Sequence, residues 1–149
     1  MKITKSNLPA GKVIASLNKG FHISTVADLS ESKASKTITV KGTKSIFKKP
    51  LDIKFNISYP LNVTVEVESK GVTSIGSLVW RVAKAYKDIY EEEENSAKIK
   101  TKPGNERGML LNRNKTNGVF GIWGHDMGDL YLVGMEICDN GVAILHIGS

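Results

Sequence analysis

The chain has 149 residues, of which 40% are hydrophobic and 24% are charged, a composition typical of one soluble globular domain over residues 1–149. Its single cysteine, Cys138, excludes an internal disulfide and a zinc site of several cysteines, and it fits a reducing compartment, so we expect a cytoplasmic location. The N-terminus lacks the apolar core of a signal peptide, and no apolar run approaches the roughly 18 residues of a membrane helix, so we expect no membrane association.

The net charge of +6 is distributed unevenly along the chain. Residues 97–118 carry six basic residues and one acidic residue, whereas residues 119–149 carry four acidic residues and no lysine or arginine. Such a layout can steer an anionic partner to one face of a protein. A lysine-rich surface that keeps the protein dissolved has the same composition, and we favour this interpretation.

The first forty residues predict short β structure. Residues 12–17 are compatible with a strand or a short helix. Residues 21–29 and 36–40 are predicted to be two strands, joined by the polar segment 30–35.

Residues 51–67 contain the clearest local pattern. Every odd position is apolar and most even positions are polar, which is the two-residue period of a half-buried β structure. Fully extended, this segment would span roughly 56 Å, more than the width of roughly 38 Å expected for a globule of this size. The segment must therefore bend or turn, and Pro60 is the natural position.

A hairpin with an odd-numbered loop centred on Pro60 would keep all the apolar side chains on one face. It pairs Ile57 with Val63 and places Lys54 opposite Glu66, a favourable cross-strand charge pair. We favour this hairpin over the alternative, one long strand bent at Pro60.

A helix over about residues 74–91 is predicted to follow the hairpin. Thr73 or Ser74 can cap its N-terminus. Apolar residues then recur at three- and four-residue spacings and form a stripe that we expect to pack on the sheet. The stripe consists of Ile75, Leu78, Val79, Val82, Ala83, Tyr86, Ile89 and Tyr90.

Trp80 lies outside this stripe, beside Lys84 and Lys87 on the expected outer face of the helix. An aromatic side chain next to two cations is a candidate stacking site for a ligand or a nucleic acid. The alternative, which we favour, is that Trp80 covers a sheet edge or a loop.

Four consecutive glutamates, residues 91–94, follow the predicted helix. Their charges would repel one another and oppose the helix dipole at its C-terminus. Either the helix stops before them or a cationic group compensates for their charge, and we favour a flexible, solvated end.

Residues 95–117 predict a long, basic connection. Loops longer than about 12–15 residues are usually functional or mobile, and basic side chains suit phosphate contacts. The signal for nucleic acid is weak because no aromatic residues lie among the basic ones. The basic residues are Lys98, Lys100, Lys102, Arg107, Arg113 and Lys115.

The C-terminal residues predict another β-hairpin. Asn140–Gly141 is typical of a two-residue type I′ turn, which would pair Ile137 with Ile144. Both faces of this hairpin are substantially apolar, so we expect it to lie centrally in the sheet. His146 and Cys138 are then interpreted as structural residues and not as reactive groups.

The glycine-rich stretch before that hairpin holds the densest polar cluster, in which His125, Asp126 and Asp129 follow Trp123. A histidine with carboxylates can bind a metal or transfer protons. In an extended backbone, however, His125 and Asp126 point to opposite faces. We favour a glycine turn in which the aspartates accept hydrogen bonds from local amides.

The sequence therefore predicts an α+β domain with a mainly antiparallel sheet of five to seven strands packed against one principal helix. The favoured function is a small binding or protein-interaction module without enzymatic chemistry, cofactor or metal. Its expected partner is another protein or a small anionic ligand. The candidate binding residues are Trp123, His125, Asp126, Asp129, Trp80, Lys84, Lys87, Arg107 and Arg113.

Two alternatives stay open. The first is a metal-dependent hydrolase or nuclease that uses His125, Asp126 and Asp129. It requires Glu136 to converge on this cluster. The second is a nucleic-acid binder that uses Trp80 and the basic loop 97–117.

Overall fold

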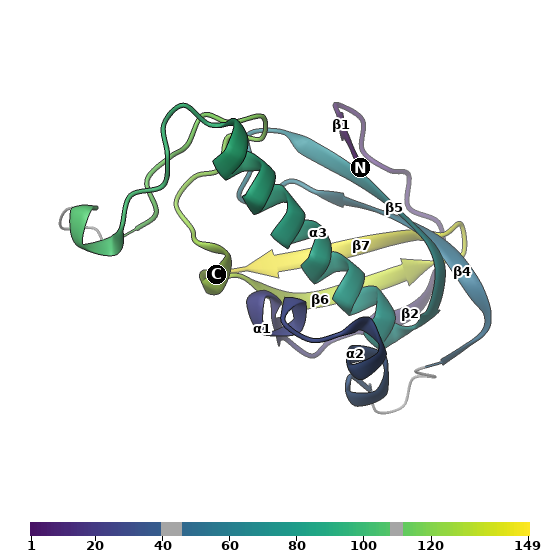
Figure 1. Ribbon diagram of the computed structural model, residues 1–149. Helices are drawn as coiled ribbons and strands as arrows, with labels where there is room; N and C mark the ends of the chain where they lie inside the picture. The colour runs from purple at the N-terminus through teal and green to yellow at the C-terminus, as the bar shows by residue number, and fades with distance from the viewer. Residues whose placement is uncertain (40–45, 108–111) are drawn as a thin grey trace.

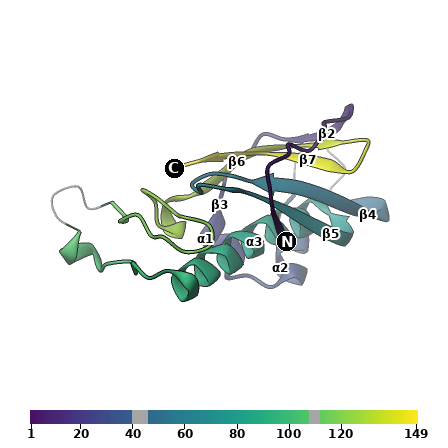
Figure 2. The same cartoon turned by 90° about the horizontal axis from the view of Figure 1, so that it is seen from above.

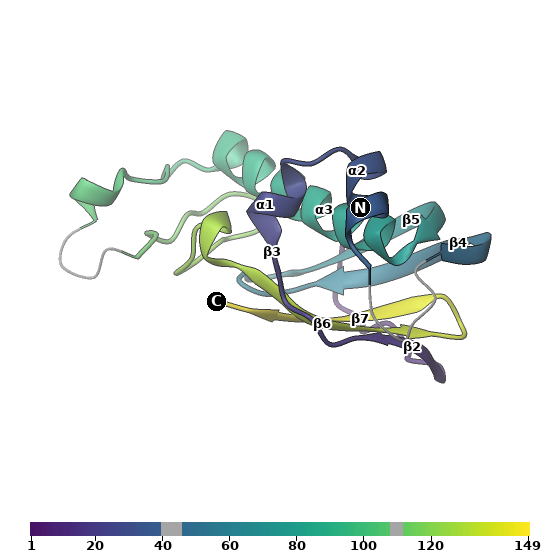
Figure 3. The same cartoon turned by 90° about the horizontal axis from the view of Figure 1, so that it is seen from below.

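The computed structural model describes residues 1–39, 46–107 and 112–149 and has the predicted α+β architecture (Figure 1). A seven-stranded, mostly antiparallel sheet carries the helices on one face, as the two rotated views show (Figures 2 and 3). The elements are β1 (Lys2–Thr4), β2 (Val13–Leu17), β3 (Phe21–His22), α1 (Ile23–Ala27), α2 (Glu31–Thr37), β4 (Ile46–Ile57), β5 (Thr64–Ser74), α3 (Ile75–Ser96), the 3-10 turns η1 (Gly104–Glu106) and η3 (Met127–Asp129), β6 (Tyr131–Cys138) and β7 (Val142–Gly148).

The strand order in the sheet is β1-β5-β4-β7-β6-β2, and β3 also pairs with β6. The neighbours pair antiparallel apart from β4 and β7, which pair in parallel through Lys54 with Val142 and Phe55 with Ala143. This parallel pair joins the hairpin from the middle of the chain to the hairpin at its end. The C-terminal hairpin is therefore central in the sheet, as expected.

The predicted hairpin over 51–67 is confirmed, and its odd-numbered residues point into the core. Its predicted register is wrong by two residues. Ile57 pairs with Val65 and not with Val63, and Lys54 pairs with Glu68. A shift of two keeps every side chain on the face assigned to it, because side chains in a strand alternate with a period of two.

The register shift has a cause in the turn, residues 58–63. Leu61 forms an isolated β-bridge with Ile122, and the Asn62 amide donates to the carbonyl of Phe120 over 3.1 Å. These residues therefore contact a distant loop and do not continue the hairpin ladder.

The two strands predicted over 21–29 and 36–40 are wrong, apart from the two residues of β3. Residues 23–27 and 31–37 form the short helices α1 and α2. Ser30 caps α2, because its hydroxyl accepts a hydrogen bond from the Lys33 amide at 3.1 Å. Val40 lies outside the described residues. Residues 13–17 form β2, one of the two structures expected there.

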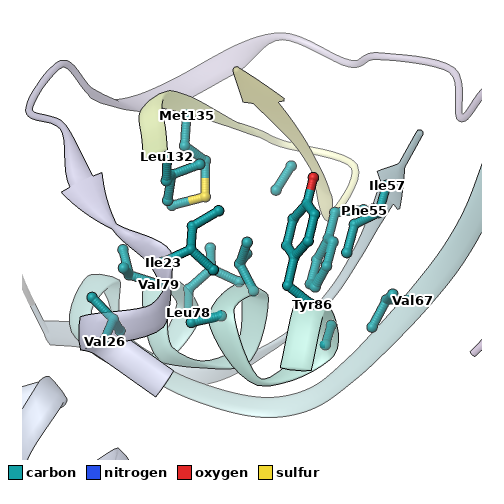
Figure 4. Packing of buried hydrophobic residues seen from close by; sticks show 14 of the residues in the cluster. Ile23, Val26, Phe55, Ile57, Val67, Leu78, Val79, Tyr86, Leu132 and Met135 are labelled. Atoms are coloured by element: carbon teal, nitrogen blue, oxygen red, sulfur yellow. The ribbon is translucent and has the colours of Figure 1, made fainter. Parts of the chain in front are cut away.

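Helix α3 has the predicted apolar stripe, and Ser74 caps it by accepting a hydrogen bond from the Ser77 amide at 3.0 Å. The stripe packs against both hairpins, and Figure 4 shows Tyr86 of α3 beside Phe55 of β4. The helix does not stop before the glutamates but continues through them to Ser96.

The C-terminal hairpin is present, but its register is one residue away from that predicted. Ile137 pairs with Ala143, and three residues, not two, connect the strands. Asp139 is held outside the ladder because its amide donates to the Lys12 carbonyl at 2.8 Å and its carboxylate accepts from the Lys12 amide at 2.9 Å. Gly141, with φ of +80°, closes this turn.

The register also changes the surroundings of His146. This side chain is exposed, and its Nε2 atom lies 2.7 Å from Glu136 on the neighbouring strand. His146 therefore contacts a carboxylate at the surface and is not part of the core. Cys138 is buried, as expected.

Candidate functional site

Glu93 organises the loop that contains most of the candidate residues. It lies near the end of α3, its exposed fraction is 0%, and its carboxylate accepts five hydrogen bonds from residues 116–122. The donors are the Thr116 hydroxyl (2.5 Å) and the amides of Gly118 (3.0 Å), Phe120 (2.9 Å), Gly121 (3.1 Å) and Ile122 (3.2 Å). We call residues 116–122 the anchored loop.

The hydrogen bonds keep Glu93 ionised in spite of its burial. Burial alone would raise the pKa of this carboxyl group, but the bonds from Thr116 and from the backbone amides outweigh it and lower the pKa below its usual range. The expectation that residues 91–94 are all solvated is therefore wrong. The anchored loop also packs closely against Glu93, because a Cβ atom at Gly118 would collide with the Glu93 carboxylate.

Arg113 braces the same loop from its other side. This arginine is 5% exposed, and its guanidinium lies 5.5 Å from the centre of the Tyr90 ring. It donates to the Ile122 carbonyl at 3.2 Å and to the Thr116 hydroxyl at 3.2 Å. Thr116 in turn donates to Glu93. Hydrogen bonds through Thr116 therefore connect Glu93, near the end of α3, to Arg113.

Asp126 is held by arginine side chains. Arg107 donates to both of its oxygens, at 2.5 and 3.2 Å, and Arg113 Nε lies 4.0 Å away. The Asp126 amide donates to Asp129 Oδ2 at 3.2 Å, which is the local bonding favoured from the sequence. The structure therefore brings Asp126, Asp129, Arg107 and Arg113 together.

An aromatic patch, consisting of Tyr59, Trp123 and His125, lies next to this polar group. The Trp123 ring packs edge-to-face against Tyr59 with 5.4 Å between ring centres, and His125 lies 5.5 Å from Tyr59. Trp123 is still 38% exposed. Ser149 completes the patch, since its hydroxyl lies 3.1 Å from Tyr59 Oη and 3.5 Å from His125 Nε2.

The backbone of the patch is fixed at several points. The Trp123 amide donates to the Pro60 carbonyl at 3.2 Å, and the Tyr90 hydroxyl donates to the His125 carbonyl at 2.8 Å. Gly124 has a φ of +73°, which a side chain would strain, and it bridges to Arg113. The exposed indole is therefore presented by a fixed backbone.

The remaining candidates lie elsewhere on α3. The Trp80 indole is partly buried and donates to the Leu29 carbonyl at 2.8 Å, in the loop between α1 and α2. Trp80 therefore covers a loop, which is the interpretation favoured from the sequence. Lys84 pairs with Asp88 at 2.9 Å. In the described part of the chain, no hydrogen bond, ion pair or aromatic contact joins Trp80, Lys84 or Lys87 to the aromatic patch.

The acidic groups do not converge in the way that a metal-dependent enzyme would need. Glu136 pairs with His146 on the open face of the sheet, and Asp126 pairs with Arg107. Within residues 1–39, 46–107 and 112–149, no three histidine, cysteine, aspartate or glutamate side chains are grouped to hold a metal ion.

The sequence interpretation missed Tyr59, Tyr90 and Glu93. A signal for Glu93 existed, because it follows Ile89 by four residues and so continues the buried stripe of α3. The sequence placed Tyr90 on the apolar stripe but did not predict its hydrogen bond to the His125 carbonyl. Nothing in the local sequence places Tyr59 beside Trp123.

Comparison of this chain with protein-family models, with curated proteins and with solved structures found no match. Among the described residues, no helix has the length and apolar character needed to cross a membrane. The functional argument therefore rests on the geometry of the site.

Proposed function

We propose that the chain is a binding module without catalytic chemistry, and that it recognises another protein through the aromatic patch of Tyr59, Trp123 and His125. One observation carries this proposal. Trp123, although 38% exposed, follows directly after a loop that is held by five hydrogen bonds to one buried carboxylate.

Rigid presentation of an exposed tryptophan suits binding for two reasons. Tryptophan is enriched among the residues that dominate the energy of protein interfaces. A side chain whose backbone is already ordered also loses less conformational entropy when a partner binds. The contacts from Glu93, Pro60 and Tyr90 supply this order before any partner arrives.

The charge near the patch favours an acidic partner surface. The described residues of the 97–118 segment project beyond the body of the protein (Figures 1 and 3). Lys98, Lys102 and Lys115 are exposed on it. Arg107 connects this segment to the patch region through Asp126. Lysines placed in this way increase the rate of encounter with a negatively charged protein.

The same contacts favour a protein partner over the alternatives. Arg107 and Arg113 already face Asp126, which leaves less positive charge for a small anion. The Asp126 carboxylate is in turn engaged by Arg107, which does not suit a metal ligand or a general base. The indole N–H of Trp80 is bonded within the fold, and this weakens the case for a nucleic-acid stacking site.

The proposal is tested with peptides selected on the full chain from a random displayed library. Binding of the enriched peptides is then measured by calorimetry with Trp123→Ala and with Ile14→Ala, a matched control that is 60% exposed on β2. We expect Trp123→Ala to weaken binding at least tenfold and Ile14→Ala to leave it unchanged.

Fold integrity is checked by circular dichroism, and it should persist in both variants because both side chains are exposed. Unchanged affinity in Trp123→Ala, or failure of the library to enrich any peptide, would overturn the proposal. A weaker affinity at higher salt is expected in addition, since the lysines of residues 97–118 contribute to encounter.

A further inference from the structure

A second surface lies at the anchored loop, formed by two hollows that share Val119 and Phe120. One hollow, of about 460 Å³, lies between the turn at residues 62–63, Ile99 and residues 115–121. The other, of about 390 Å³, lies between β1, Val65 and the last turns of α3. Because they share two lining residues, we treat them as one surface, the Val119 groove.

Exposed apolar side chains concentrate in this groove. Nine large hydrophobic residues are exposed in the described part of the chain, and four of them line the two hollows. They are Met1, Ile3, Ile99 and Val119, with exposed fractions between 47% and 59%. Scattered single apolar residues are normal on a protein surface, but a contiguous group in a hollow is typical of a binding site.

The groove also borders an edge of the sheet. β1 is the first strand in the sheet order, and it pairs with β5 from Lys2 with Glu66 to Thr4 with Thr64. In the described residues no strand pairs with its other side. An open edge offers backbone donors and acceptors to an incoming extended chain.

The two ends of the groove carry opposite charges. Lys115 lines the hollow at the 115–121 end, and Lys98 is exposed next to Ile99. Glu92 lines the hollow at the α3 end and is exposed. Asp88 and Lys2 line the same hollow, but both are paired, Asp88 with Lys84 at 2.9 Å and Lys2 with Glu66 at 3.4 Å. The groove is therefore basic at one end and acidic at the other.

From these observations we infer that the Val119 groove binds an extended peptide segment of a partner protein, added as a strand to the open edge of β1. Its alternate side chains point to one side, so apolar residues of one strand can fill both hollows. An acidic residue of the peptide faces Lys115, and a basic residue faces Glu92. This site is separate from the aromatic patch and does not rest on the function proposed for it.

The probe is a nine-residue synthetic peptide with valine at alternate positions, two glutamates at one end and two lysines at the other. It is titrated into the ¹⁵N-labelled full chain. We expect saturable amide shifts in residues 2–4 and 118–120 and slower hydrogen exchange in β1, because strand addition bonds its outer edge. The same peptide with its charged ends exchanged should bind at least tenfold more weakly.

Two exposed valines provide a matched pair of variants. Val119→Asp places a charge inside the groove, whereas Val133→Asp places the same charge on β6, where the valine is 53% exposed. We expect the first to weaken binding at least tenfold and the second to leave it unchanged, with both proteins folded.

Several results would overturn the inference. They are no shifts up to about 1 mM peptide, equal affinity of Val119→Asp and the parent chain, and equal affinity of the two peptides with exchanged charges. Shifts confined to Trp123 and its neighbours would also remove the groove as the site, and would support the aromatic patch instead. The two proposals therefore fail independently.

Discussion

The two halves of helix α3 are held by different interactions. In the N-terminal half, Leu78, Val79 and Val82 are buried against the sheet and the short helices by apolar contacts. In the C-terminal half, Glu93 and Tyr90 form hydrogen bonds to a distant loop. Apolar contacts are not directional, whereas hydrogen bonds have defined geometry. Both halves bury apolar residues, including Tyr86 and Ile89 in the second, but only the second half adds the directional contacts that position a surface.

The two halves should also differ in their response to conditions. Burial of apolar area does not depend on protonation, so the contribution of Leu78, Val79 and Val82 to stability should not change with pH. The contacts of Glu93 depend on a charged carboxylate. Substitutions in each half therefore distinguish the apolar contacts from the hydrogen bonds.

The largest effect is expected from Leu78→Ala in the apolar half. Leu78 is fully buried, and replacing it leaves a cavity, so the free energy of unfolding should fall by about 3–4 kcal/mol. Urea unfolding at several pH values measures the loss, which should be the same at each pH. Ile14→Ala is the exposed control, and a comparable loss there would contradict the assignment of Leu78 to the core.

Glu93→Gln should have the next largest effect, about 2–3 kcal/mol, because an NH₂ group would replace one acceptor oxygen and leave buried amides without partners. We expect faster hydrogen exchange in residues 118–122 before any change in the core of the sheet. Glu92→Gln is the matched control, since Glu92 is exposed. Equal protection of the loop in both variants would show that Glu93 does not hold it.

The same carboxylate predicts an acid response of the natural protein. The pKa of Glu93 is lower in the folded state than in the unfolded chain. The contribution of Glu93 to stability is therefore complete above its pKa in the unfolded chain, about 4.3. It is lost as the pH falls through the lower pKa that Glu93 has in the folded state. Hydrogen exchange of the anchored loop, followed from pH 6 downward, should show this loss, and Glu93→Gln should abolish that part of the pH dependence.

The smallest of these effects is expected from Trp80→Phe. This change keeps an aromatic ring but removes the hydrogen bond to the Leu29 carbonyl, so the unfolding free energy should fall by about 1 kcal/mol. Chemical denaturation measures it, and Trp80→Phe should bind the selected peptides as the parent chain does. A large loss of peptide affinity would instead support the binding role considered for Trp80.

The parts of the fold that the sequence predicts have strong local periodicity. The alternation over 51–67 predicted the hairpin, and the stripe from Ile75 predicted α3. The register of the hairpin was not predictable, because it depends on the contact between Leu61 and Ile122, which are far apart in the chain. The short helix α1 was missed because its five residues contain too few turns to display a helical period.

The candidate site was predictable only where its residues are close in sequence. Residues 123–129 form an unusual cluster of polar and aromatic residues in the sequence, and they also lie together in the structure. Their partners, Tyr59 and Arg107, come from other parts of the chain. The basic loop made Arg107 a candidate, but no local pattern places either residue beside this cluster. Glu93 was not predicted to be buried, because four consecutive carboxylates indicate a solvated run even though Glu93 continues the apolar stripe.

The strand order has a consequence for the chain during its synthesis. β2 pairs with β6, so that Leu17 lies opposite Met135. At about 5–20 residues per second, a ribosome needs roughly 6–24 s to produce the partner strand after the first one. During that interval the apolar side of β2 has no partner. The nascent chain therefore depends on β6 to complete this part of the sheet. Interruption of translation before β6 would release a product in which β2 is unpaired and Leu17 is exposed.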